Sequence, residues 1–259
     1  MKKDFNDKVV IASPVRDLLN AMILQFLREI CPTVQIEQFL LVPDQAEKRL
    51  LAGELDLVVT PITMQNAEIS HVKCAEEEIV LVVGQDHPLA GKGAVRLWDA
   101  RNDSFLVNES SFDKRILTVH CELVGFTPNI TLYSNENSVI HRALHYNMGV
   151  SLIPGNVLYR NRDTMEGLVP LRLTDVEIIR MIGVATRKDR ILSNNAQKLV
   201  NFACRYFERL GAETSDYLDS ILPPVELEGR KTMGIRNIRS AAAPARPFSV
   251  QASSQPEEE

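Results

Sequence analysis

Residues 44–60 read Asp-Gln-Ala-Glu-Lys-Arg-Leu-Leu-Ala-Gly-Glu-Leu-Asp-Leu-Val-Val-Thr, and the order of residue types in this segment predicts the fold class. Asp44 and Glu47 have the spacing of a capping box, which predicts that a short helix begins there. Gly53 can adopt the left-handed conformation and is expected to end that helix. Residues 55–60 then form an apolar run that is typical of a buried strand. A helix that turns directly into a buried strand favours an α/β fold.

Strands alternate with helices on both sides of this stretch. Residues 8–12 are expected to form a strand, and Ser13 followed by Pro14 predicts a helix start, because serine caps helices and proline fits the first turn. Apolar residues then recur at helical spacing as far as Ile30. Further strands are expected at 34–42, 78–84, 104–107, 129–133, 150–153 and 181–186, and further helices from Ser110 or Ser111 to Gly125, from Asn135 to Asn147 and from Asn194 to Leu210. The alternation predicts a parallel sheet.

The composition excludes several classes of protein. The 259 residues include 34 acidic and 29 basic side chains, which gives a formal net charge of −5. Such a chain is a poor candidate for nonspecific binding to polyanions. No apolar run is long enough for a secretory signal or a membrane span, so we expect a soluble, cytoplasmic protein. The scattered cysteines contain no C-x-x-C pair and are expected to be reduced, mostly buried thiols: Cys31, Cys74, Cys121 and Cys204.

The end of the chain has a different character. The helix that begins near Asn194 is expected to end at Leu210, with Gly211 beyond it. Hydrophobic periodicity stops at about Asp219, and prolines, serines and a final acidic run follow. Residues 212–259 are therefore predicted to be a disordered C-terminal tail.

Four segments, in this order and spacing, resemble the effector-binding domain of LysR-type transcriptional regulators. They are residues 50–57 (LLAGELDL), 81–90 (LVVGQDHPLA), 125–130 (GFTPNI) and 149–154 (GVSLIP). With the last strand and helix, the resemblance covers about residues 8 to 211. It implies an α/β fold of two Rossmann-like lobes joined by two crossover strands, similar to type 2 periplasmic binding proteins. Lobe I would comprise 8–83 and 184–211, lobe II would comprise 84–183, and the hinges would be Gly84, Gln85, Gly183 and Val184.

Two polar residues of the matching segments are expected to be structural. Asp56 is too polar for a buried strand unless it is hydrogen-bonded, so we expect it to fix the turn that Gly53 begins. His87 follows a strand directly and is expected to hold the crossover into the second lobe.

A ligand site is expected where the two lobes face each other. Ligands of open α/β sheets bind beyond the carboxyl ends of the strands, and helix N-termini there favour anions. The predicted effector-binding residues are Ser13, Pro14, Gln45, Thr60, Pro61, Asn108, Ser110, Ser111, Asn135 and Asn137. The resemblance implies that Ser13, Ser110 and Ser111 hold the effector, although each serine can equally cap its own helix. Asp44 and Glu136 are expected to be caps, and Arg16 and Arg115 could reach the cleft.

No catalytic residue, cofactor or metal site is predicted. His141 and His145 share one helix face and form a metal half-site at most, because no third ligand is evident. In the family this helix contacts a partner subunit, which is the preferred interpretation. The glycine patterns of nucleotide-binding loops and of serine hydrolases are absent from the sequence.

The resemblance implies a small-molecule effector-sensing domain that controls transcription through a ligand-dependent dimer rearrangement. The expected partners are a small molecule, which can be a carboxylate or another anion, and a second copy of the chain or a full-length regulator. No contact with a membrane is expected. The winged helix-turn-helix of the family is not in this sequence, so DNA binding requires a missing N-terminal domain. The alternatives are a stand-alone ligand-binding protein of this fold, an enzyme on this fold and a transport receptor.

Overall fold

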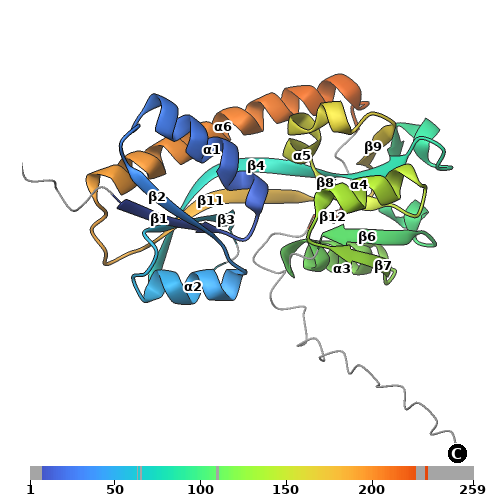
Figure 1. Cartoon of the computed structure of the whole chain (residues 1–259). Coiled ribbons are helices and arrows are strands. Elements are labelled where there is room, and N and C mark those ends of the chain that lie inside the picture. The colour runs from blue at the N-terminus through green and yellow to red at the C-terminus, as the bar shows by residue number, and fades with distance from the viewer. Residues whose placement is uncertain (1–7, 63, 65, 109–110, 226–230, 233–259) are drawn as a thin grey trace, which may run out of the picture.

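The computed structural model describes residues 8–62, 64, 66–108, 111–225 and 231–232, of which 16–18, 111–113, 164 and 231–232 are described by their backbone alone. Figure 1 shows two α/β halves side by side, which we call lobe I and lobe II. Two long strands, β4 (Ile69–Gly84) and β11 (Ile179–Arg187), pass from one lobe to the other. The predicted architecture of two α/β lobes joined by two strands is confirmed. The predicted parallel sheet is only partly correct, because β11 pairs antiparallel with β3 and β4, which makes the sheet mixed.

Lobe I is a five-stranded sheet with helices on both faces (Figure 1). Its sheet order is β2 (Gln35–Leu40), β1 (Lys8–Ser13), β3 (Leu57–Pro61), β11 and β4, and its helices are α1 (Arg16–Glu29), α2 (Pro43–Leu51) and α6 (Asn194–Ile221). Because side chains alternate along a strand, Val9 and Ile11 pack with α1 and α6, whereas Ala12 packs with Ala46 and Leu50 of α2. The core of lobe I therefore lies in two layers.

Lobe II is built on the second half of β4. The elements of lobe II are β5 (Ala94–Val95), β6 (Ser104–Asn108), β7 (Asn129–Ser134), β8 (Ser151–Pro154), β9 (Leu168–Leu173), β10 (Val176–Glu177), α3 (Ser111–Val124), α4 (Asn137–His145), α5 (Gly155–Arg160) and three short 3₁₀ turns, η1 (Ala90–Lys92), η2 (Leu97–Ala100) and η3 (Arg162–Thr164). Strand β4 pairs with β8 and β9, and β6 pairs with β7 in a parallel two-stranded sheet. Leu81 and Val83 pack toward α3, and Val80 and Val82 pack toward α4.

The crossing points differ from the predicted hinges. From Ile79 onward, β4 pairs with β8 and β9 of lobe II, and Gly183 of β11 already pairs with Thr60 of lobe I. The strands therefore cross at residues 76–78 and 179–181. Gly84 is the last residue of β4, at its end in lobe II, and Gln85 follows it. Gly183 and Val184 lie inside the sheet of lobe I. The predicted boundaries at 83/84 and 183/184 therefore do not coincide with the crossing points.

Helix α6 is longer than predicted and reaches both lobes. Gly211 lies within this helix instead of ending it. A Cβ atom at position 211 would lie 3.3 Å from the Cβ atom of Ala75, so glycine lets the helix pack close to β4. Leu218, farther along, is buried in the core of lobe II. Residues 212–221 of the predicted tail are thus helical. Lys231–Thr232 forms β12 and pairs with β10, and the remainder of that tail, 226–230 and 233–259, lies outside the described residues.

Several predicted helix caps are wrong. Helix α1 begins after Val15, because the Ser13 hydroxyl accepts a hydrogen bond from the Val15 N–H at 3.0 Å and makes a tight turn instead. Helix α2 begins at Pro43, which removes the capping box of Asp44 and Glu47, and α4 begins after Glu136 rather than Asn135. Neither Asp44 nor Glu136 makes a side-chain cap. The predicted stops at Gly53 and Gly125 are confirmed, with φ of +76° and +105°.

The structural role of Asp56 is confirmed. One carboxylate oxygen accepts the Val10 N–H at 2.7 Å and the other contacts Arg190 Nη2 at 2.6 Å, so Asp56 ties β3 to β1 and to the segment after β11. The His87 ring nitrogen Nδ1 accepts the Leu89 N–H at 3.2 Å. His87 is therefore also structural, but it holds a turn inside lobe II rather than a crossover.

Of the helices in the described part of the chain, none combines the length and the apolar character that a membrane span needs.

A buried histidine gives the fold a predicted pH dependence. His120 of α3 is 2% exposed, and its burial lowers its pKa from the ordinary value of 6.5. Below about pH 6.5 the unfolded chain binds a proton that folded His120 does not bind, so the free energy of unfolding should fall as the pH falls. His120→Gln should flatten this decline when melting temperatures are compared at several pH values between 8 and 5.5. If the melting temperatures of the variant and the unaltered chain fall in parallel as the pH falls, His120 is not the cause of the pH dependence.

Candidate functional site

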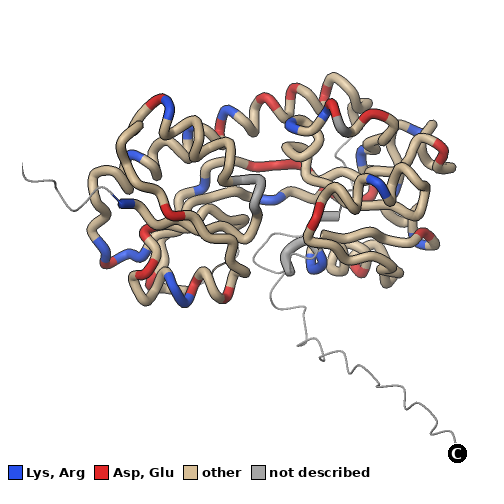
Figure 2. The backbone as a smooth tube through the Cα atoms, in the orientation of Figure 1, with Lys and Arg blue, Asp and Glu red and all other residues tan. Residues whose placement is uncertain are grey.

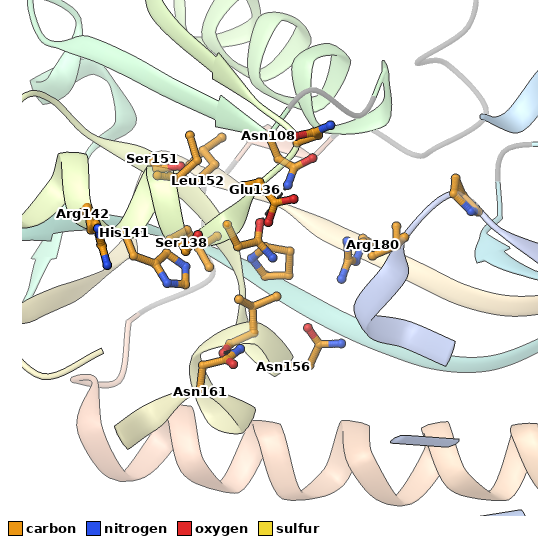
Figure 3. A pocket seen from close by; sticks show the side chains of 18 of the residues that line it. Asn108, Glu136, Ser138, His141, Arg142, Ser151, Leu152, Asn156, Asn161 and Arg180 are labelled. Atoms are coloured by element: carbon orange, nitrogen blue, oxygen red, sulfur yellow. Dashed lines mark hydrogen bonds between the residues drawn. The ribbon is translucent and has the colours of Figure 1, made fainter. Parts of the chain in front are cut away.

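A cavity of about 660 Å³ lies between the two lobes (Figure 3). Lobe I contributes the entry to α1 and the end of β2, lobe II contributes β6, β8, α4 and α5, and β11 contributes one residue from its crossing segment. The lining residues are Pro14, Val15, Leu40, Asn108, Asn135, Glu136, Asn137, Ser138, Ile140, His141, Arg142, His145, Ser151, Leu152, Ile153, Pro154, Asn156, Val157, Asn161 and Arg180.

The structure brings four of the ten predicted site residues to this cavity. These are Pro14, Asn108, Asn135 and Asn137. Ser13, Thr60 and Pro61 are instead buried in the sheet of lobe I, and Gln45 is exposed on α2, so none of these four lines the cavity. Ser110 lies outside the described residues, and Ser111 is described only as the first backbone position of α3.

A buried ion pair lies at the crossing point. Arg180 and Glu77 are directly opposite each other on β11 and β4, and Arg180 Nε donates to Glu77 Oε2 at 2.7 Å. Their side chains are 2% and 4% exposed. The second carboxylate oxygen of Glu77 accepts the backbone N–H of Asn156 at 2.8 Å, so the pair also positions the start of α5. Figure 2 shows the acidic stretch in the middle of β4, where it passes between the lobes.

Two polar atoms beside this pair have no hydrogen-bond partner among the residues that the structure describes. They are Arg180 Nη2, a donor, and Asn156 Oδ1, an acceptor, and both belong to buried residues that line the cavity. Buried polar groups are normally satisfied, because an unmade hydrogen bond costs about 1–3 kcal/mol. A ligand that offers an acceptor to Arg180 Nη2 and a donor to Asn156 Oδ1 would satisfy both atoms.

The first turn of α4 also lines the cavity. Asn108 Nδ2 donates to Asn137 Oδ1 at 2.8 Å, which fixes the entry to this helix against β6. The N-terminal end of a helix carries a partial positive charge and favours anions. In Figure 3, His141 and Arg142 of α4 lie at one end of the cavity and Arg180 at the other.

Charges of both signs lie around the cavity, and the charge of Arg180 is compensated by Glu77. Arg142 and Arg180 line it, and Glu136 is the one carboxylate among the described lining residues. The arginines predicted to reach the cleft do not account for this charge. Arg115 is not among the lining residues, and the side chain of Arg16 is not described.

Sequence reasoning missed Arg180 and Asn156. The signal was present for Arg180, because it interrupts an apolar run at 178–185 and faces an acidic run at 76–78. Asn156 gave no signal, since it belongs to a short helix that was not predicted. His141 and His145 both line the cavity, and among the described residues no three His, Cys, Asp or Glu side chains are placed to hold a metal ion.

Comparisons with known proteins point to one family and one fold. A sequence model of the LysR substrate binding domain matches residues 9–207. The transcriptional dual regulator GltC of Bacillus subtilis (strain 168) is 26% identical over 159 residues, which are 61% of this chain and 52% of that protein. The chain spans about half the length of the curated relatives that it matches.

Two solved structures have the same fold at low sequence identity. The effector binding domain of QuiR in complex with shikimate is 17% identical with a TM-score of 0.66, over 78% of this chain and 97% of that chain. The CcmR regulatory domain of Synechocystis PCC6803, in complex with 2-PG, is 18% identical with a TM-score of 0.69, over the same shares of 78% and 97%.

Proposed function

Because the chain belongs to the family of LysR substrate-binding domains, we propose that it is the effector-sensing part of a LysR-type transcriptional regulator. The observation that carries this proposal is the cavity between the lobes, where a buried donor of Arg180 and a buried acceptor of Asn156 lack partners within the described chain. A binding role fits these groups directly, since they are held in place by the Glu77 contacts. We propose no catalytic reaction for the cavity.

The effector that fits best is a small molecule with a carboxylate or another anionic group. An anionic oxygen can accept from Arg180 Nη2, and a hydroxyl or amine on the same molecule can donate to Asn156 Oδ1. The first turn of α4, which also lines the cavity, adds a partial positive charge. Shikimate and 2-PG in the complexes of the two related domains support this class of ligand.

Ligand binding in this position would act on the angle between the lobes. A molecule in the cavity contacts Pro14 and Val15 of lobe I together with α4 and α5 of lobe II. It can shift the protein toward a closed arrangement only to the extent that it binds that arrangement more tightly. The two crossing segments, at 76–78 and 179–181, are where we place the bending.

The proposed partner of the chain is a second copy, or a full-length regulator that contains the same domain. Large apolar side chains are exposed on α1 and around α4: Leu24 at 68%, Val139 at 42%, Tyr146 at 78% and Met148 at 58%. Contact between two such surfaces would remove them from water. Contact with DNA is assigned to a further domain, and the proposed location is the cytoplasm. A chain that stays monomeric at every concentration in sedimentation equilibrium contradicts the self-association.

A thermal-shift screen tests the sensing proposal. A set of small hydroxy and keto carboxylates at millimolar concentration should include acids that raise the melting temperature by roughly 5 °C, since a ligand at 100 times its Kd stabilises the folded state by about 2.7 kcal/mol. Asn137→Ala should weaken the response, because Asn137 lines the cavity. Gln45→Ala, which changes an exposed residue outside the cavity, is the matched control. If no acid shifts the melting temperature, the proposal fails.

A further inference from the structure

Two cysteines that are 130 residues apart in sequence meet where α6 packs on β4. The Sγ atoms of Cys74 and Cys204 are 2.6 Å apart. Cys74 belongs to a β-bulge, because the pairing of β4 with β11 shifts register between Ile182 and Gly183 and leaves Cys74 with no residue directly opposite. Bulges of this kind re-aim a side chain, and here the thiol is aimed at the helix.

The pair is accessible to small reagents, unlike the most buried thiol of the chain. Cys74 and Cys204 are each partly exposed, whereas Cys121 is 0% exposed. Cys31 is also partly exposed, but its thiol donates to Asn195 Oδ1 at 3.5 Å and lies apart from the pair. Cys31 therefore provides an internal control of similar exposure.

The two thiols are not equivalent. The contact with the Cys74 thiol lowers the pKa of Cys204, and the same contact together with burial raises the pKa of Cys74. The carboxylate of Glu208, one helical turn from Cys204, acts in the opposite direction and raises the pKa of Cys204. The net direction favours Cys204 as the sulfur that carries thiolate character, and the thiolate is the nucleophilic form.

We infer that Cys74 and Cys204 are a redox modification site that forms a reversible disulfide with a peroxide as the oxidant. Cys204 sulfur attacks one peroxide oxygen, the O–O bond breaks, and the products are a Cys204 sulfenic acid and one water after proton transfer. Cys74 sulfur then attacks Cys204 sulfur, the S–O bond breaks, and the released hydroxide takes the Cys74 proton to form a second water. Two thiols and one hydrogen peroxide thus give one disulfide and two waters, and a dithiol reductant reverses the change.

The location gives this bond a mechanical consequence. Cys74 precedes the crossing segment 76–78 by two residues, and α6 packs against β4 there through Gly211. Farther along α6, which extends over both lobes in Figure 1, Leu218 packs against Gly155 and the core of lobe II. A disulfide would fasten a helix that contacts both lobes to the strand that joins them. The oxidised protein should therefore bend less at the crossing point.

Peptide mapping of the oxidised full chain tests the inference without reference to any effector. The reduced chain has four thiols. After treatment with about one equivalent of hydrogen peroxide, two thiols should remain, a peptide containing Cys74 should be linked to one containing Cys204, and dithiothreitol should restore all four. The link closes a loop of more than 100 residues, so the melting temperature should rise by roughly 10 °C.

Single substitutions separate the roles of the cysteines. Cys31→Ser should form the same link as the unaltered chain. Cys74→Ser should stop at a Cys204 sulfenic acid that a 1,3-dione reagent captures, and Cys204→Ser should lose both the link and this capture. The inference is overturned if all four thiols persist in peroxide, if the bond involves Cys31, or if the bond joins two chains. Because these readouts are made on the unaltered chain first, a poorly folded variant does not decide the outcome.

Discussion

Glu77→Gln is expected to lower the free energy of unfolding by about 3–5 kcal/mol, the cost of leaving one partner of a buried ion pair alone. Glutamine keeps the size of the side chain and can still accept the Asn156 N–H, so the change isolates the loss of charge. Arg180 would keep its positive charge at 1% exposure with no carboxylate beside it. Urea denaturation measures the loss as a lower midpoint at an unchanged slope.

A surface pair and a double variant control this prediction. Glu54 pairs with Arg49 at 2.8 Å, but the Glu54 side chain is 55% exposed, so Glu54→Gln should cost less than about 1 kcal/mol. Replacing Glu77 and Arg180 together with leucine should cost less than Glu77→Gln alone, because no unpaired charge then remains. A loss below about 1 kcal/mol for Glu77→Gln would show that the pair is not buried as described.

Asn156→Leu is expected to weaken the binding of the best acid from the thermal-shift screen by about tenfold or more, which corresponds to about 1.4 kcal/mol. The same change should leave the free energy of unfolding unchanged or higher, because it removes a buried acceptor that has no partner in the described chain and fills the space with a side chain of similar size. The affinity for the acid should therefore fall without a loss of stability. Isothermal titration measures the affinity, and parallel thermal melts measure the stability.

The matched control is Asn201→Leu, the same change at an exposed position of α6. It should leave the affinity for the acid unaltered. If Asn156→Leu and the unaltered chain bind the acid with equal affinity, Asn156 does not contact the ligand. A large loss of stability in Asn156→Leu would instead show that its amide has an essential structural partner.

Much of the fold could be predicted because the lobes are built from regular local patterns. The segment 44–60, with its helix, glycine and buried strand, carries the α/β pattern on its own, and the four matching segments extend it to two lobes. The first half of β4 was missed because residues 70–78 are mixed and charged, without the alternation that marks a half-buried strand. Its pairing with β11 is a tertiary contact that local pattern does not reveal.

Helix α6 shows how packing overrides a local signal. Gly211 has the sequence position of a helix stop, since glycine is common just past a helix end. The structure uses it for close approach to Ala75, and burial of Thr214 and Leu218 then carries the helix to Ile221. The sequence contains the apolar positions of this extension, but their partners lie in lobe II.

The site was only half predictable for a related reason. Ligands of open α/β sheets lie beyond the strand ends, and this rule predicts which backbone positions are near the ligand. Four residues selected in this way do line the cavity: Pro14, Asn108, Asn135 and Asn137. The rule does not give the direction of a side chain, so it also selected residues that the sheet buries, such as Thr60. Arg180 was missed because a charged residue inside an apolar strand becomes meaningful only when Glu77 is known to face it.

We propose that the cavity between the lobes recognises the anionic group of a small molecule. Isothermal titration of the full chain with the best carboxylate from the screen, and separately with the methyl ester of the same acid, tests it most directly. We expect one acid molecule bound per chain and an ester that binds at least about tenfold more weakly, because the ester lacks the charge that Arg180 Nη2 and the first turn of α4 would meet. Equal binding of acid and ester, or no binding of either, would contradict it.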